Sequence, residues 1–369
     1  MRIGIDATVF KGSTYTGVSR CAYEIIRNWI KRYPEHEYFL FSGTTILPEL
    51  ILPDNWHRVV KPCVVGGAQV WNIIELPKLI KQNKIDAFWG PNFILPKKNG
   101  NIKYYVTVHD LAPFKIRGIA ATSNSLKLKL FAKRSCLRAD KVIAVSKATQ
   151  KDVIDIFKIP EKKVIVSYNG GLPTEFTSDC LVKKVCKLEK EKYFLFVSTI
   201  EPRKNLITLI KAFEKYLENT NSNIKLVLVG KKGWKCKSIF NAIENSPYKE
   251  QIILPGYVSD EEKAWLYQNA VGFIFPSLYE GFGIPILEAM AYGVITITAK
   301  NSSLCEVGGD AVLYMQNEKD TEELSQLMNK VVSMKKEEKT IFRKKMEKQV
   351  RKFSWDKNAD EIMKLIMQN

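Results

Sequence analysis

The stretch "VGFIFPSLYEGFGIPILEAMAYGVITITA", residues 271–299, decides the fold. Both of its ends are short apolar runs of the kind that form buried strands. Between them, Pro285 suits the first position of a helix and Gly293 suits the residue just past a helix end. We therefore predict a short helix over residues 285–292. A strand, a helix and a second strand in this order are typical of a parallel sheet covered by helices.

The same alternation of apolar strands and helical patterns runs along the whole chain. A polar stretch, residues 170–192, interrupts it and is the expected linker. Two such series predict an α/β protein with two Rossmann-like, doubly wound domains, residues 1–175 and residues 190–355. Ligands of such sheets bind at the carboxyl ends of the strands, so we expect both domains to contribute to one cleft. The expected strands are 3–8, 37–43, 86–90, 104–110, 141–146, 163–169, 193–199, 224–230, 252–256, 271–277 and 294–299.

Composition narrows the class of protein. The 369 residues are 46% hydrophobic and 26% charged, as in soluble globular proteins. No apolar run is long enough to cross a membrane, and "MRIGIDATVF" lacks the apolar region of a signal peptide, so we expect a cytoplasmic protein. Seven cysteines without a C-x-x-C pair predict reduced thiols and neither a zinc nor a redox site.

The net charge of +18 predicts an anionic partner: nucleic acid, an anionic membrane or a phosphorylated substrate. The alternative that is not an enzyme is a basic nucleic-acid-binding protein. The chain has no zinc-ligand spacing, RNP-like segment or basic heptad region, and we therefore expect no nucleic-acid partner.

Two glutamates flank the expected helix of residues 285–292. Gly281 and Gly283 let the backbone approach a ligand, and a helix N-terminus is an anion site. Because like charges repel, Glu280 and Glu288 cannot be there for the phosphate and must accept hydrogen bonds from neutral hydroxyl groups. A phosphate between two such carboxylates predicts a nucleotide-sugar site. The alternative is a surface loop followed by an ordinary helical glutamate.

A second motif, "STIEPRKNLITLIKAF", occupies residues 198–213. It places Arg203 and Lys204 at a turn from a strand into a helix. There the pair can clamp a diphosphate and stabilise the charge of a leaving group. The alternative is a basic pair on the surface without a ligand.

Two further motifs fall in the first half of the chain. Gly17, in "YTGVSRCAYEIIRNW", begins a predicted helix, but G-x-G-x-x-G and the P-loop pattern are both missing. His109 and Asp110, in "TVHDLAP", end a strand, where His109 can contact a sugar; a structural His–Asp pair is the alternative. The other two histidines, His36 and His57, read as loop residues, so no histidine metal site is expected.

Together these residues resemble the retaining GT-B glycosyltransferases of family 4, the "glycosyl transferases group 1". The resemblance covers nearly the whole chain and is most specific in "EGFGIPILE" and "EPRKN". It implies a GT-B fold whose C-terminal helix, residues 356–369, packs back on the N-terminal, acceptor-binding domain. The C-terminal domain then binds the donor.

The resemblance also implies roles for single residues. The catalytic set comprises Glu280 at the donor hexose, Arg203 and Lys204 at the diphosphate, and His109 at the transferred sugar. The residues implied to contact the acceptor are Asp110 and Tyr15. The implied donor-binding residues are Gly17, Val258, Phe282, Gly283, Ile284 and Glu288, of which Glu288 binds the ribose.

The implied reaction moves a hexose from a nucleotide-diphosphate sugar to a glycan or lipid-linked acceptor in cell-surface polysaccharide synthesis, with retention of configuration. GDP-mannose is the first choice of donor, and UDP- or dTDP-sugars are alternatives. A sugar-nucleotide epimerase or a phosphorylase could use the same fold. No D-x-D occurs, so neither a metal nor another cofactor is expected.

Residues 123–141, "SNSLKLKLFAKRSCLRADK", predict a membrane-docking helix. Leu126, Leu130, Phe131 and Leu137 can share one side, with Lys127, Lys129, Lys133, Arg134 and Arg138 around them. A basic amphipathic helix lies at a lipid interface. We therefore expect a peripheral protein at the anionic inner face of the cell membrane.

Overall fold

The computed structural model describes residues 1–10, 16–44, 46, 51–62, 71–98, 100–116, 122–171 and 188–368, without the side chains of 122–129. The chain forms two compact units. Unit 1 comprises Met1–Gly170 and Ser354–Asn369, and unit 2 comprises Gly171–Phe353.

Unit 1 is built on a sheet of seven parallel strands among the described residues, in the order β3-β2-β1-β4-β5-β6-β7. Most of these strands are buried along nearly their whole length, which is why they appear in the sequence as continuous apolar runs. The strands are β1 (Arg2–Asp6), β2 (Glu37–Ser42), β3 (Trp56–Val60), β4 (Ala87–Gly90), β5 (Lys103–Val108), β6 (Lys141–Ala144) and β7 (Val164–Val166).

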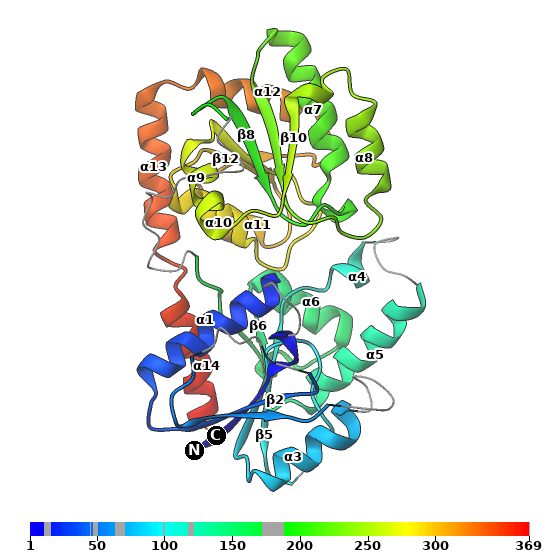
Figure 1. Cartoon of the computed structure of the whole chain (residues 1–369), viewed down its shortest axis with the longest axis vertical. Helices are drawn as coiled ribbons and strands as arrows, with labels where there is room; N and C mark the ends of the chain where they lie inside the picture. The colour runs from blue at the N-terminus through cyan, green and yellow to red at the C-terminus, as the bar shows by residue number, and fades with distance from the viewer. Residues whose placement is uncertain are drawn as a thin grey trace. The chain divides into compact units, whose positions relative to one another are not determined.

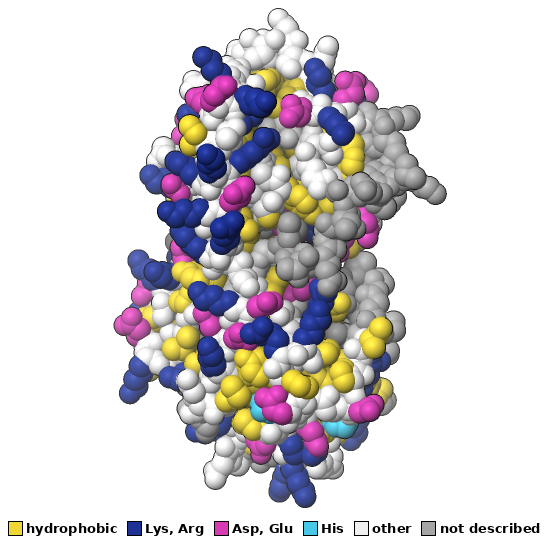
Figure 2. All heavy atoms as spheres, turned by 90° about the vertical axis from the view of Figure 1, so that its left-hand side faces the viewer, with side chains coloured by type: hydrophobic (Ala, Val, Ile, Leu, Met, Phe, Trp, Pro, Cys, Tyr) yellow, Lys and Arg dark blue, Asp and Glu magenta, His cyan; other side chains and the backbone are white. Residues whose placement is uncertain are grey.

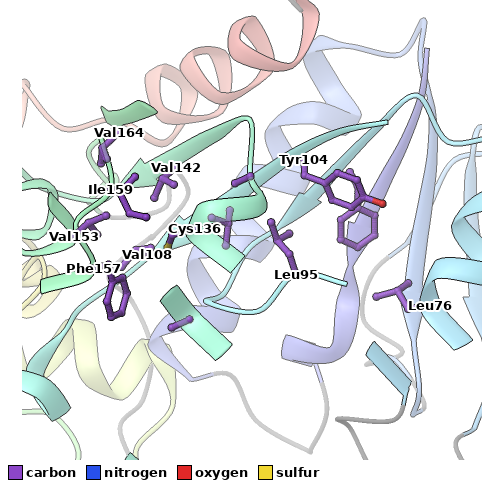
Figure 3. Packing of buried hydrophobic residues seen from close by; sticks show 14 of the residues in the cluster. Leu76, Leu95, Tyr104, Val108, Cys136, Val142, Val153, Phe157, Ile159 and Val164 are labelled. Carbon is purple, nitrogen blue, oxygen red and sulfur yellow. The ribbon is translucent and has the colours of Figure 1, made fainter. Parts of the chain in front are cut away.

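Helices cover both faces of this sheet. One face packs on α1 (Gly17–Arg32) and α14 (Trp355–Met367), which lie side by side in Figure 1. The other face packs on α3 (Leu76–Gln82), α5 (Thr122–Arg138) and α6 (Lys147–Phe157). Figure 3 shows this second core, where Cys136 of α5 and Phe157 of α6 lie close to strand residues such as Val108 and Val142. Unit 1 also contains η1 (Ala7–Phe10), the π-helix η2 (Trp71–Glu75), α4 (Ala112–Lys115) and η3 (Glu161–Lys163).

Helix α14 is a full part of the core of unit 1, although it follows all of unit 2 in the chain. Its Ile362 and Met363 are buried against the sheet, and Ala359 O accepts a hydrogen bond of 2.9 Å from Trp29 Nε1 of α1. The chain leaves unit 1 at Gly170, directly against the start of α14. A Cβ atom at Gly170 would lie 2.4 Å from the backbone nitrogen of Trp355, so only glycine permits this close approach.

Unit 2 repeats the plan with a six-stranded parallel sheet among the described residues, in the order β10-β9-β8-β11-β12-β13. Its strands are β8 (Tyr193–Val197), β9 (Lys225–Val229), β10 (Ile252–Gly256), β11 (Gly272–Phe275), β12 (Thr296–Ala299) and β13 (Leu313–Met315). Its helices are α7 (Leu206–Thr220), α8 (Lys237–Glu244), α9 (Asp260–Asn269), α10 (Ile284–Ala291), α11 (Leu304–Gly308), α12 (Thr321–Ser333) and α13 (Lys336–Val350), with the short turns η4 (Pro202–Lys204) and η5 (Lys249–Gln251). The central strands β8 and β11 are neighbours, so the loops that follow them lie at one edge of the sheet.

The α/β fold class predicted from the sequence is confirmed, with local corrections. Strands β3 and β13 were missed, and His57, expected in a loop, lies on β3. Helix α10 begins at Ile284, so Pro285 occupies its second position and not its first. Gly293 does follow the end of that helix, in the left-handed conformation at φ 71°.

The surface of unit 2 is strongly basic along α13. Figure 2 shows Lys and Arg side chains gathered on the face that carries this helix. The exposed basic residues there are Lys335, Lys336, Arg343, Lys344, Lys348, Arg351 and Lys352. Across the described parts of both units, no helix combines the length and the apolar character needed to cross a bilayer.

Candidate active site

The loop between β11 and α10 is held in a conformation that only glycine adopts easily. Gly283 caps the helix with φ 107°, where a Cβ atom would also lie 3.0 Å from Leu304 Cδ2. The hydroxyl of Ser303 donates hydrogen bonds to the carbonyls of Glu280 and Phe282, at 2.9 and 2.8 Å. The loop is therefore fixed before any ligand arrives. At the start of α10, Pro285 has no N–H, and the amides of Ile286 and Leu287 donate to the carbonyl of Gly283 at 3.1 and 3.4 Å, so attraction of an anion to this helix end depends mainly on the helix dipole.

Glu280 is the electrostatic centre of this loop. Its Oε1 lies 2.6 Å from Lys204 Nζ and its Oε2 lies 2.7 Å from Arg203 Nη1. Both Glu280 and Lys204 are buried, at 8% and 5% exposure. Burial alone would raise the pKa of Glu280, but the two cations outweigh it and hold that pKa at about 2. Glu280 is therefore ionised throughout the neutral range.

Arg203 is shared between two carboxylates. Besides Glu280, its guanidinium contacts Glu201, with Nη2 2.9 Å from Glu201 Oε1. The second oxygen of Glu201 accepts a hydrogen bond of 3.0 Å from Trp234 Nε1. Among the described residues, the ion pairs of this cluster join two cations, Arg203 and Lys204, to two carboxylates, Glu201 and Glu280. The sequence predicted Arg203 and Lys204 near a diphosphate but did not predict that both also pair with Glu280.

Backbone contacts join the two loops that carry this cluster. The amide of Leu278 donates to the carbonyl of Arg203 at 2.9 Å. The side chain of Asn205 donates to the carbonyl of Pro276 at 3.1 Å. Because these contacts fix both loops, the charged groups are pre-positioned at the carboxyl edge of the sheet, where ligands of parallel sheets bind.

Glu288, on α10, has its own partners. Its Oε1 lies 2.8 Å from Lys263 Nζ, and its Oε2 accepts a hydrogen bond of 3.1 Å from the Tyr267 hydroxyl. Both partners come from α9, whose start is fixed by a capping box between Ser259 and Glu262. Val258, one of the implied donor-binding residues, directly precedes that cap and is buried.

The candidate residues of unit 1 lie at the carboxyl edge of the other sheet. His109 follows β5, and its Nε2 donates a hydrogen bond of 2.8 Å to the carbonyl of Pro91. Burial lowers the pKa of His109, so the ring is neutral at pH 7. Asp110 accepts a hydrogen bond of 3.1 Å from the amide of Ala112, the first residue of α4. No hydrogen bond joins His109 to Asp110 within the described residues, but the charge of Asp110 acts on the ring and offsets part of the effect of burial on the pKa of His109.

Gly17 is the first residue of α1, after the cap formed by Thr16 and Ser19. A Cβ atom at Gly17 would meet nothing within 4 Å among the described residues. Tyr15, the other candidate near this point, lies outside the described residues.

Sequence reasoning missed four residues of the site: Glu201, Trp234, Lys263 and Tyr267. Glu201 stands directly before the "PRKN" turn, so its position was a usable signal. Trp234 and Lys263 come from elements whose proximity to the site depends on the strand order of unit 2. In the described part of the chain, no group of three His, Cys, Asp or Glu side chains is arranged to hold a metal ion.

Comparison with known proteins agrees with this geometry. Residues 181–353 match the family model "Glycosyl transferases group 1", and residues 15–170 match "Glycosyltransferase Family 4". The chain is 26% identical over 315 residues to O-antigen chain mannosyltransferase B of Escherichia coli, covering 81% of this chain and 82% of that protein.

Two solved structures share the fold. WaaG, a glycosyltransferase involved in lipopolysaccharide biosynthesis, superimposes with a TM-score of 0.75 at 15% identity over the full length of both chains. Anabaena HepE, in complex with UDP and glucose, gives a TM-score of 0.73 at 16% identity over 100% of this chain and 99% of that one. The fold and the matches to both family models together define a GT-B glycosyltransferase. The chain belongs to the group 1, family 4 glycosyltransferases, whose two models cover its two halves.

Proposed function

We propose that this glycosyltransferase moves a hexose from a nucleotide-diphosphate sugar, with GDP-mannose as first choice, to a glycan or lipid-linked acceptor of a cell-surface polysaccharide. The observation that carries the proposal is the buried Glu280 carboxylate held between Arg203 and Lys204, beside the start of α10. It combines anion-binding groups from the loop after β8 with a hydroxyl acceptor from the loop after β11. The choice of mannose follows the similarity to the Escherichia coli O-antigen mannosyltransferase.

In the proposed site, the diphosphate lies at the N-terminus of α10 and against Arg203 and Lys204. Glu280 keeps one or more lone pairs for the hydroxyls of the hexose, and Glu288 accepts from the ribose. Arg203 and Lys204 already pair with Glu201 and Glu280 among the described residues, so the dipole at the start of α10 would supply much of the compensation for the incoming diphosphate.

We propose transfer with retention of configuration and without a glycosyl-enzyme. The bond between the anomeric carbon and the phosphate oxygen breaks, and the acceptor oxygen attacks from the same face. The proton of the acceptor hydroxyl passes to the leaving phosphate oxygen. Glu280 is a poor nucleophile in this arrangement because both of its oxygens already bind cations. It orients the sugar instead.

A donor screen tests the proposal. Purified protein is incubated with GDP-mannose, UDP-GlcNAc, UDP-glucose and dTDP-rhamnose, and thermal shift and donor hydrolysis are measured for each. We expect the largest shift with GDP-mannose, hydrolysis that survives EDTA, and a retained anomeric configuration in the product by NMR. An inverted product would overturn the mechanism, and a covalent adduct on Glu280 would restore it as the nucleophile. A preference for a UDP- or dTDP-sugar would replace the donor but keep the reaction.

We further propose that α5 docks unit 1 on the inner face of the cell membrane, where lipid-linked acceptors lie. Leu130 and Leu137 are about half exposed, at 49% and 50%, and Arg134 beside them is exposed. Apolar side chains on such a basic helix are suited to the interface of an anionic bilayer.

A further inference from the structure

Asp6 is a buried carboxylate that the proposed reaction does not use. It is the last residue of β1, at the carboxyl edge of the sheet of unit 1, and its exposure is 4%. Strand β4, which lies beside β1, separates it from β5 and His109. Since side chains alternate along a strand, Asp6 leaves β1 on the face opposite Ile5, which packs toward α1 and α14.

The described hydrogen-bond partners of Asp6 contact only one of its two carboxylate oxygens. The amide and the hydroxyl of Thr8 donate hydrogen bonds of 3.0 and 2.6 Å, and both go to Oδ1. No Lys or Arg pairs with Asp6 among the described residues, and no described donor reaches Oδ2.

A turn of this kind does not need a charge. The contact between Oδ1 and Thr8 is the local turn that an asparagine makes equally well. Burial raises the pKa of Asp6 more than the Thr8 hydrogen bonds lower it, so the carboxylate costs stability where an amide would not. A costly group at the ligand-binding edge of a parallel sheet is more typical of a binding site than of a structural turn.

We propose that Asp6 is an acceptor-binding residue whose Oδ2 accepts a hydrogen bond from a neutral hydroxyl group of a hexose acceptor. A carboxylate oxygen without a nearby cation can accept a hydrogen bond from a neutral hydroxyl group, whereas it would repel an anionic ligand. This inference rests on the proposed transfer reaction for the identity of the ligand, and it extends the acceptor contacts expected from Asp110 and Tyr15 to the central strand of the sheet.

The test measures binding and not turnover, so a failure of the transfer reaction is not mistaken for a failure of this inference. Methyl α-D-mannopyranoside serves as the hydroxyl-bearing probe, and its affinity is measured by saturation-transfer NMR and by thermal shift. The variant Asp6→Asn keeps the Oδ1 contact with Thr8 but turns Oδ2 into a donor. We expect its affinity for the probe to fall by about tenfold or more, with a melting temperature equal to or above that of the wild type.

Two further variants separate binding from the local turn. Thr8→Ala removes a partner of Oδ1 and leaves Oδ2 untouched, so it should keep the affinity. Asp86→Asn makes the same chemical change next to the amino end of β4 and should also bind normally, because Asp86 lies at the opposite edge of the sheet, where its carboxylate accepts the amide of Arg2. The inference is overturned if Asp6→Asn binds the probe as well as the wild type, if Thr8→Ala loses as much affinity as Asp6→Asn, or if the wild type does not bind the probe.

Discussion

The carboxylate of Glu280 and the ammonium of Lys204 lie 2.6 Å apart in the interior of unit 2, although 76 positions separate the two residues in the chain. They meet because β8 and β11 are adjacent in the sheet and each residue stands in the loop that follows one of these strands. The pair therefore links the integrity of the site to the folding of the whole unit.

Glu280→Gln should damage both stability and activity. The substitution leaves Lys204 buried with only part of its charge compensated, and loss of one partner of a buried ion pair costs about 3–5 kcal/mol. We expect urea unfolding to show this loss and transfer to fall steeply, while the anomeric configuration of any residual product stays unchanged. Glu218→Gln, on the exposed surface of α7, is the matched control. A fully stable and active Glu280→Gln enzyme would contradict the proposed role.

Arg203→Ala should lower kcat as well as weaken donor binding. The guanidinium is expected to act on charge that develops on the leaving diphosphate, and the loss of one such contact commonly costs about 10²–10³ in rate. Arg203→Lys keeps the charge but cannot contact Glu201 and Glu280 with a planar fork, so an intermediate rate is expected. The measurement is kcat and KM for the donor, by steady-state kinetics on the wild type, Arg203→Ala and Arg203→Lys. A rise in KM with unchanged kcat would mean that Arg203 stabilises the bound donor and the transition state equally.

Acid should destabilise unit 2 through Glu280 only at low pH. Its pKa is about 2 in the folded protein and near the ordinary value of 4.5 when unfolded. A carboxylate with a lowered pKa contributes stability that is fully present above pH 4.5 and is lost as the pH falls toward 2. The contribution is on the order of 3 kcal/mol. Urea unfolding between pH 2 and 6 should show this slope in the wild type and a reduced slope in Glu280→Gln.

Lys263→Met should weaken binding of GDP. Without Lys263, the Glu288 carboxylate keeps only Tyr267 of the two α9 side chains described above, and its orientation toward a ribose is lost. We expect the dissociation constant measured by calorimetry to rise about tenfold, the effect of about one hydrogen bond to a charged group. Lys215→Met breaks an exposed ion pair with Glu322 and serves as control. Tighter GDP binding by Lys263→Met would mean that Lys263 competes with the nucleotide for Glu288.

Membrane docking predicts co-sedimentation with anionic vesicles and weak binding to neutral ones. Replacing Lys133 and Arg134 of α5 with Glu should abolish it, since each basic residue near the surface contributes about 1 kcal/mol. The matched control carries the same charge change on α13, at Lys344 and Lys348, both exposed. Equal binding to neutral and anionic lipid would refute the prediction, and a loss with the α13 variant alone would move the docking surface to unit 2.

Most of the fold could be predicted because buried parallel strands carry a strong local signal. Phe194, Phe196, Phe273 and Phe275 are fully buried, and their strands appear as unbroken apolar runs. The missed strands lie at the edges of the sheets. β3 is largely exposed beyond Trp56, and β13 has only three residues, so neither forms such a run.

The site was predictable in position but not in its pairings. The turn after β8 and the loop before α10 both carry sequence signals, and the structure brings Arg203, Lys204 and Glu280 together. Which loops touch depends on the strand order of unit 2, and that order is set by packing of the entire sheet. For the same reason, the contacts of Lys263 with Glu288 and of Trp234 with Glu201 could not be read from local patterns.

The place of α14 in the core of unit 1 has a consequence for the order in which the two units mature during translation. The side of α1 that carries Trp29 stays uncovered until the ribosome has made all of unit 2, since Ala359, Ile362 and Met363 come after it. Unit 2 is one continuous segment and can close as soon as it emerges. We therefore expect nascent chains arrested after residue 353 to resist protease in the second unit while the first is still cut, with protection of the first unit appearing only when α14 is released.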